Sequence, residues 1–268
     1  MSACKNCGTQ LGETEDYCSA CGAKVIRNRL TIRNLWGDFT EQFLNYDNKL
    51  LKTFVQLFRN PEDVIGSYIN GTRKKYVNVV SYFALALTLS GIQIFVIRKF
   101  FPEALDIGAF LPENAANTST VDMDWVYDYQ SIVALINLPV YAIMARLTFF
   151  GKKKFNYTEH LVIMTYIMGQ FTIISFFAVT TGVILGGNFY ILNNFAILFL
   201  ALYTIYCYRR LYPLSIKQCF KHIGIFLLVV LVFLIGVTVI QAVVMYLNGD
   251  MDKMIQDAIE AQKQRQAS

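Results

Sequence analysis

The sequence predicts an all-α membrane protein with five transmembrane helices and a small cysteine-rich head before them. Hydrophobic residues make up 55% of the 268 residues and charged residues only 16%, a composition typical of multi-span membrane proteins. Apolar runs of about 20 residues recur along the chain, and each is long enough to cross a hydrocarbon core about 30 Å thick. Four of the six cysteines lie within the first 21 residues, which sets the head apart from the spans.

The head has the spacing of a four-thiolate metal site. Its two Cys-x-x-Cys-Gly motifs are separated by ten residues between Cys7 and Cys18. Each motif can form a tight turn that directs two thiolates to one point, and the glycine after it permits the left-handed backbone that closes the turn. We therefore predict one structural Zn²⁺, since four thiolates leave no position open for a substrate. Two disulfides or a redox dithiol are the alternatives. The predicted ligands are Cys4, Cys7, Cys18 and Cys21.

Residues 1–24, with these four cysteines and the trailing glycines Gly8 and Gly22, resemble the zinc-ribbon headers that precede many bacterial membrane proteins. The head carries two lysines against three acidic residues, so nucleic acid is not expected as a partner. A cytosolic protein partner, or a contact that caps the chain's own membrane domain, fits this charge better. So small a unit has almost no core and is expected to be unfolded without metal.

Residues 25–78 are expected to form a short basic linker and then cytoplasmic amphipathic helices. From Leu30 to about residue 60, apolar side chains recur every three or four residues, which predicts one amphipathic helix or two. The apolar stripe can lie in the headgroup region of the membrane or pack on the membrane domain, and both alternatives stay open. Pro61 is placed to begin a further helix, which Gly71 ends.

The stretch from Asn60 to Asn78 resembles a signature of a family of uncharacterised bacterial multi-pass membrane proteins that carry the same zinc-ribbon header. Members often have a second proline where this chain has Val77-Asn78. The resemblance covers roughly the first hundred residues and implies a domain of unknown function, with no catalytic residues to transfer. The signature residues are Pro61, Val64-Ile65, Tyr68-Ile69, Gly71, Arg73-Lys74-Lys75 and Tyr76.

The membrane domain is predicted over residues 79–247. The basic cluster Arg73-Lys74-Lys75, directly before the first span, should stay in the cytoplasm. The loop after the first span is acidic, those after the second and fourth are basic, and Gly186-Gly187-Asn188 is an uncharged tight turn. These loops predict a cytoplasmic N-terminus and an external C-terminal tail, residues 248–268. The predicted spans are residues 79–97, 131–150, 161–185, 189–208 and 223–247.

The charge distribution agrees with this orientation. With residues 1–78, Arg146 and the two basic loops inside, the inside carries 19 Lys and Arg against 9 Asp and Glu, and the outside 5 against 10. A basic face toward anionic lipid then explains the net charge of +5 without nucleic acid. The predicted location is the bacterial cytoplasmic (inner) membrane. Five spans after a large cytosolic N-terminal region also resemble the layout of Yip1-like membrane proteins.

No charged residue is expected in the middle of a span, where it would point to transport or catalysis. Arg146, His160 and His222 fall near span ends, where water or snorkelling should satisfy them. Gly182-x-x-x-Gly186 has the spacing of a close helix contact, which leaves a homo-oligomer open. The uncharged polar residues of the spans can bond between helices or line a pathway; they are Gln93, Asn137, Gln170, Asn193, Asn194 and Gln241.

These features favour a non-enzymatic role. The predicted function is an integral membrane scaffold or adaptor whose zinc ribbon and basic inner face bind a soluble protein partner or anionic lipid. The alternative is a small transporter or channel that uses the polar span residues and a kink at Pro139. An intramembrane enzyme is disfavoured, because acid-base catalysis needs positioned titratable groups and the spans lack them. Cys207 and Cys219 are expected to be inert, reduced thiols.

Overall fold

The computed structural model describes residues 2–12, 14–23, 25, 31, 49–106 and 129–248. The chain divides into two compact units, Met1–Lys49 and Leu50–Ser268. Three predicted features therefore lie largely outside the described residues. They are the amphipathic stretch before residue 49, the acidic loop 107–128 and the C-terminal tail from residue 249.

The first unit contains a two-stranded antiparallel sheet. Strand β1 (Ser2–Ala3) pairs with β2 (Gln10–Leu11). Leu11 is buried against Cys4 and Cys18, and this cluster is the whole hydrophobic core that the described part of the head contains. So little buried apolar surface gives little stabilisation, and the fold of the head must therefore depend on its cysteines.

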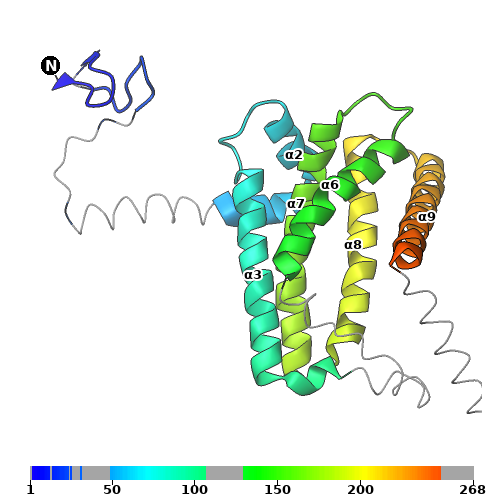
Figure 1. The fold of residues 1–268 in the computed structure, drawn as a ribbon. Helices are drawn as coiled ribbons and strands as arrows, with labels where there is room; N and C mark the ends of the chain where they lie inside the picture. The colour runs from blue at the N-terminus through cyan, green and yellow to red at the C-terminus, as the bar shows by residue number, and fades with distance from the viewer. Residues whose placement is uncertain are drawn as a thin grey trace, which may run out of the picture. The chain divides into compact units, whose positions relative to one another are not determined.

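The second unit is a bundle of helices. Figure 1 shows α3, α7 and α8 running alongside one another; α7 packs against α3, α6 and α8, while α9 packs mainly against α6. After helical residues 50–59 the elements are α2 (Pro61–Ile69), α3 (Val79–Phe100), the 3-10 helix η1 (Pro102–Leu105), α6 (Gln130–Thr148), α7 (Tyr157–Ile184), α8 (Phe189–Leu211) and α9 (Ile216–Leu247).

Five helices, α3, α6, α7, α8 and α9, are long and apolar enough to cross a membrane. Their number agrees with the sequence prediction and indicates a multi-pass membrane protein. The most buried of the five is α7, at the centre of the bundle, and the least buried is α9. Most of the described side chains of α9 are exposed and apolar, a surface that suits lipid and not water.

The helices do not end where the apolar runs end. Hydropathy falls at the first charged residue, whereas a helix continues until its backbone amides or carbonyls find other partners. Asn156 and Glu159 form a capping box at the start of α7, and Asn188 caps α8, as such side chains commonly do. Relative to the predicted spans, α3 runs on to Phe100, α6 stops at Thr148, α7 begins at Tyr157, α8 runs on to Leu211 and α9 begins at Ile216.

The short connections follow the sequence prediction closely. Pro61 is the first residue of α2, and Gly71, with φ of +90°, lies just beyond its end. Gly186, with φ of +89°, lies in the tight turn between α7 and α8. Glycine reaches these left-handed conformations without the steric cost that a Cβ would bring.

Candidate functional site

Two turns of the same form bring the four cysteines together. The Gly8 amide donates to the Cys4 carbonyl, and the Gly22 amide donates to the Cys18 carbonyl, each over 2.8 Å. The φ angles of Gly8 and Gly22 are +78° and +70°, as their place after each Cys-x-x-Cys predicts. The repeated motif in the sequence is thus a repeated local structure.

The four sulfur atoms lie within 4.8 Å of one another. Cys4 Sγ is 3.7 Å from Cys21 Sγ, and Cys7 Sγ is 3.5 Å from Cys18 Sγ, so each close pair joins the two turns. Four thiolates bound about 2.3 Å from one tetrahedral metal would lie about 3.8 Å apart. The geometry therefore fits a single four-coordinate metal ion.

Two of these thiols have neighbours that favour ionisation. The Thr9 hydroxyl lies 3.2 Å from Cys7 Sγ, and its hydrogen bond lowers the pKa of Cys7 to about 6. The Asn6 side chain likewise lowers the pKa of Cys21. Metals bind the thiolate form, so these two contacts favour metal binding. Burial and the hydrogen bonds with Cys7 and Cys21 instead raise the pKa of Cys18 to about 11, so a metal must displace the proton of this thiol.

The second unit holds a network of hydrogen bonds that sequence analysis did not foresee. The last four carbonyls of a helix have no partner within the helix, and here tyrosines of α8 supply partners for two of these carbonyls at the end of helical residues 50–59, while Gln170 of α7 donates to a carbonyl further from that end. Gln170 Nε2 donates to Phe54 O over 3.1 Å. Tyr203 Oη donates to Leu57 O over 3.0 Å, and Tyr206 Oη donates to Phe58 O over 2.7 Å. Of the two alternatives for this part of the amphipathic stretch, packing on the membrane domain is the one observed.

The segment that leads into α3 is fixed by the same part of the bundle. The Val77 amide donates to Thr53 Oγ1 over 3.0 Å, and the Val77 carbonyl accepts from Tyr166 Oη over 2.8 Å. Tyr82 Oη donates to Gln170 Oε1. Thr53, Tyr82, Tyr166 and Gln170 are all fully buried. We call residues 50–82 the anchored segment, because these buried bonds tie it to α7 and α8.

Two exposed ion pairs extend this network to the surface. Arg210 Nε donates to Glu62 Oε2 over 3.0 Å, which joins α8 to α2. Lys75 Nζ lies 2.7 Å from Asp63 Oδ1, and Tyr76 also donates to this carboxylate. The hydrogen bonds from Lys75 and then Tyr76 hold the pKa of Asp63 below its usual value.

His160 is placed differently from the sequence prediction. It is fully buried, with Nδ1 3.1 Å from Tyr208 Oη and Nε2 3.2 Å from Tyr212 Oη. A neutral imidazole has one donor and one acceptor, so two tyrosine hydroxyls satisfy it without water, and the expectation of water or snorkelling is wrong here. The partners lie 48 and 52 positions away, which no local pattern can indicate. Phe149 stacks on Tyr212 and His222, with ring centres 4.3 and 4.6 Å apart.

Several other predicted residues take part in packing within the chain. Gln93 Nε2 donates to Ser175 O over 3.2 Å, a bond between α3 and α7 as the packing interpretation predicts. A Cβ at Gly182 would lie 2.7 Å from Leu192 Cδ1, so this glycine permits close contact between α7 and α8. Cys207 and Cys219 are buried free thiols that lie outside the metal-ligating cluster.

Comparison with known families gives one match. Residues 47–91 are similar to a family described as a protein of unknown function (DUF3667). The match contains the whole anchored segment and continues into the middle of α3. No curated protein and no solved structure matches the chain.

Proposed function

We propose that this chain is an integral membrane scaffold or adaptor whose head, folded around one structural Zn²⁺, recruits a soluble cytosolic protein. The proposal depends chiefly on the four sulfurs that lie within 4.8 Å of one another. A metal enclosed by four thiolates keeps no position for a substrate, so its role is to fold the head. Because the head is a unit separate from the bundle, a partner can bind it without repacking the spans.

Zinc is the metal that this set of donors suits best. Four cysteine thiolates on two tight turns are typical of structural zinc sites, and soft thiolates select against magnesium and calcium. The small core of the head, in which Leu11 is buried against Cys4 and Cys18, supports a fold that needs the metal. Nucleic acid is not part of the proposal, since the head carries more acidic than basic residues.

The proposed orientation has the head and the basic loops in the cytoplasm of a bacterial cell. Lys153, Arg209, Lys217 and Lys221 are exposed. Lys153 lies in the loop before α7, Arg209 lies in the last turn of α8, and the other two lie in the first turns of α9. Exposed lysine and arginine next to a span favour the cytoplasmic side and attract anionic lipid there. The same face would hold a recruited protein close to the membrane.

The proposal can be tested by purifying interacting proteins in mild detergent and measuring zinc in the same samples. The test variant changes Cys4, Cys7, Cys18 and Cys21 to serine, and Cys219→Ser is the matched control outside the head. We expect the fourfold variant to insert normally and to lose both zinc and a soluble partner, whereas the control keeps both. Loss of zinc with an unchanged set of bound proteins would show that the head has no recruiting role.

Two cavities between α3 and α6, of about 500 and 460 Å³, do not support the transporter alternative, because neither is lined by Asn137 or Pro139. Asn137 lies partly exposed and Pro139 exposed on α6. A flux that Asn137→Leu with Pro139→Ala abolishes in liposomes would restore this alternative.

A further inference from the structure

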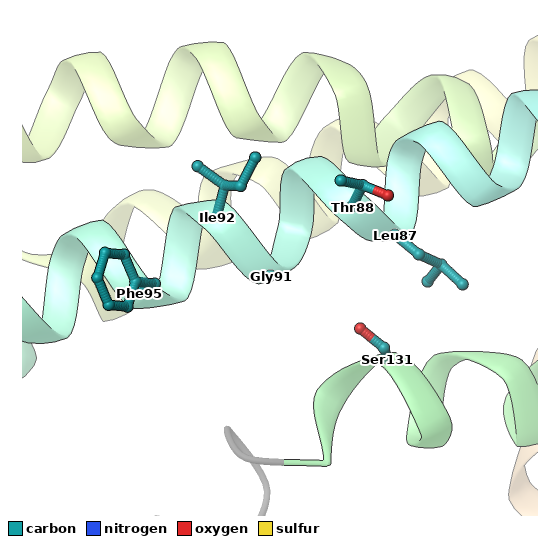
Figure 2. Close-up of a pocket in the computed structure, with 6 residues that line it drawn as sticks. All are labelled: Leu87, Thr88, Gly91, Ile92, Phe95 and Ser131. Carbon is teal, nitrogen blue, oxygen red and sulfur yellow. The ribbon is translucent and has the colours of Figure 1, made fainter.

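A groove lies between α3 and α6. It consists of two neighbouring cavities of about 500 and 460 Å³, which share Gly91, Phe95 and Ser131 in their lining. Figure 2 shows the Ser131 side chain pointing from the start of α6 toward α3.

The α3 wall of the groove is apolar and about as long as one leaflet. Leu87, Ile92 and Phe95 line the first cavity (Figure 2). Gly91 leaves the groove open, since a Cβ there would have no neighbour within 4 Å. From Leu87 to Arg98 the helix rises about 16 Å at 1.5 Å per residue, and half of a hydrocarbon core is about 15 Å. An extended acyl chain of one leaflet therefore fits the length of this wall.

The second cavity, toward the end of α3, is lined by basic and polar residues. Arg98, Lys99 and Gln130 contribute to its wall. The Lys99 ammonium lies 5.4 Å from the ring centre of Phe95, which faces both cavities, so a positive charge is held beside the groove. Gln130 Oε1 is buried and has no hydrogen-bond partner in the part of the chain that the structure describes. A buried acceptor without a donor costs about 1–3 kcal/mol, and a ligand hydroxyl could remove that cost.

We propose that this groove binds one anionic phospholipid of the phosphatidylglycerol type. Its acyl chain lies along Leu87, Ile92 and Phe95, its phosphate is next to Lys99, and a headgroup hydroxyl donates to Gln130. The positive charge of Lys99 beside the second cavity favours an anionic ligand. The length of the apolar wall on α3 favours a lipid with an acyl chain over a small soluble phosphate. The site is at the opposite end of α3 from α2 and the anchored segment, so it is independent of the recruiting role proposed for the head.

The experiment uses the full chain in phosphatidylcholine vesicles that contain a minor fraction of phosphatidylglycerol, extracted in mild detergent for native mass spectrometry. We expect one retained phosphatidylglycerol per chain and little phosphatidylcholine. Lys99→Gln should weaken retention about tenfold, as the loss of one charge-assisted contact does. Gly91→Phe should displace the lipid by filling the groove. The matched controls are Lys153→Gln at the other end of the bundle and Gly236→Phe, a glycine of α9 with equally open surroundings, and both should retain the lipid.

Three outcomes would overturn the proposal. One is equal retention of phosphatidylcholine and phosphatidylglycerol, and another is retention that neither Lys99→Gln nor Gly91→Phe reduces. The third is a dimer that Gly91→Phe abolishes, because the groove would then hold a second copy of this chain. Since Gly91→Phe alters a helix interior, Lys99→Gln gives an independent answer if the first variant folds poorly.

Discussion

Gln170 of α7 holds two parts of the anchored segment, the helix that contains Phe54 and the start of α3 at Tyr82, through a single side chain. Its amide donates to Phe54 O over 3.1 Å and its oxygen accepts from Tyr82, in a fully buried position. We expect Gln170→Leu to lower the free energy of unfolding by about 1–3 kcal/mol, because it leaves buried polar partners unsatisfied. Asn194→Leu changes an exposed residue of α8 and should have little effect. Denaturant unfolding in detergent checks this, and equal stability of the two variants would contradict it.

Replacing Gly8 with alanine tests whether metal binding by the head needs the left-handed backbone at this position. An alanine there meets no neighbour within 4 Å, yet its φ of +78° disfavours any residue with a Cβ, at a cost of about 1–2 kcal/mol. We expect Gly8→Ala to weaken metal binding about 5- to 30-fold, since 1.4 kcal/mol is tenfold in affinity. Gly12→Ala is the control, because its Cβ would make only an ordinary contact with Glu15. Competition with a chelator measures both, and unchanged affinity in Gly8→Ala would count against the two-turn geometry.

At this scale the sequence predicts local chemistry well and distant partners poorly. The cysteines and their glycines could be assigned because each turn is complete within five residues, from Cys4 to Gly8 and from Cys18 to Gly22. Gln170 and His160 could be placed near or in a helix but not given partners. Their hydrogen bonds join positions 116 and 48 residues apart, and only the packing of the bundle brings these together.

At the scale of elements, the amphipathic stretch shows what periodicity leaves undecided. A helix that lies on headgroups and a helix that packs on other helices present the same apolar stripe. The hydrogen bonds from Tyr203 and Tyr206 to Leu57 and Phe58 decide in favour of packing for residues 50–59. Helix ends were uncertain for a related reason, since capping by Asn156 or Asn188 follows local backbone geometry and not hydropathy.

The contact between α2 and the loop before α3 should depend on pH through Asp63. Its pKa lies below the ordinary value of 3.8, chiefly because Lys75 and then Tyr76 hydrogen-bond to the carboxylate. A group with a lowered folded pKa stabilises the protein above its unfolded pKa, and this contribution is lost as the pH falls through the folded value. We therefore expect Asp63→Asn to be less stable than the parent chain at pH 7. This difference in stability should shrink as the pH falls below about 4.

Thermal unfolding in detergent at pH 7 and in the acid range measures this difference. Glu103→Gln, a change to an exposed acid of η1, is the matched control and should leave the pH dependence unchanged. The contribution of Asp63 should be modest, because its side chain is 42% exposed and such pairs are screened by solvent. If the difference in thermal stability between Asp63→Asn and the parent chain stayed the same across the acid range, the proposed contribution of the Asp63 carboxylate would be contradicted.

At the scale of the whole molecule, hydropathy sums over many residues, so the number of candidate spans could be predicted even where their ends could not. The groove between α3 and α6 could not be predicted, because it depends on how far two helices diverge. Its lining residues come from helices separated by residues 101–129, and they include a glycine and a serine that carry no distinctive signal alone. The sequence thus specifies the parts of the bundle more directly than the spaces between them.

An odd number of spans would place the two ends of the membrane domain on opposite sides of the membrane, and the loop charges predict which end is cytoplasmic. The loop after α6 carries Lys152, Lys153 and Lys154, and loops rich in lysine resist translocation. We therefore expect a fusion at Lys153 to report from the cytoplasm and fusions at Asn117 and Ser268 to report from outside. Alkaline phosphatase, active only outside, and a fluorescent protein that folds in the cytoplasm give opposite signals at each point. A cytoplasmic signal at Ser268 with an external one at Asn117 would require an even number of spans, and reversed signals at all three points would place the head and its proposed partner outside the cell.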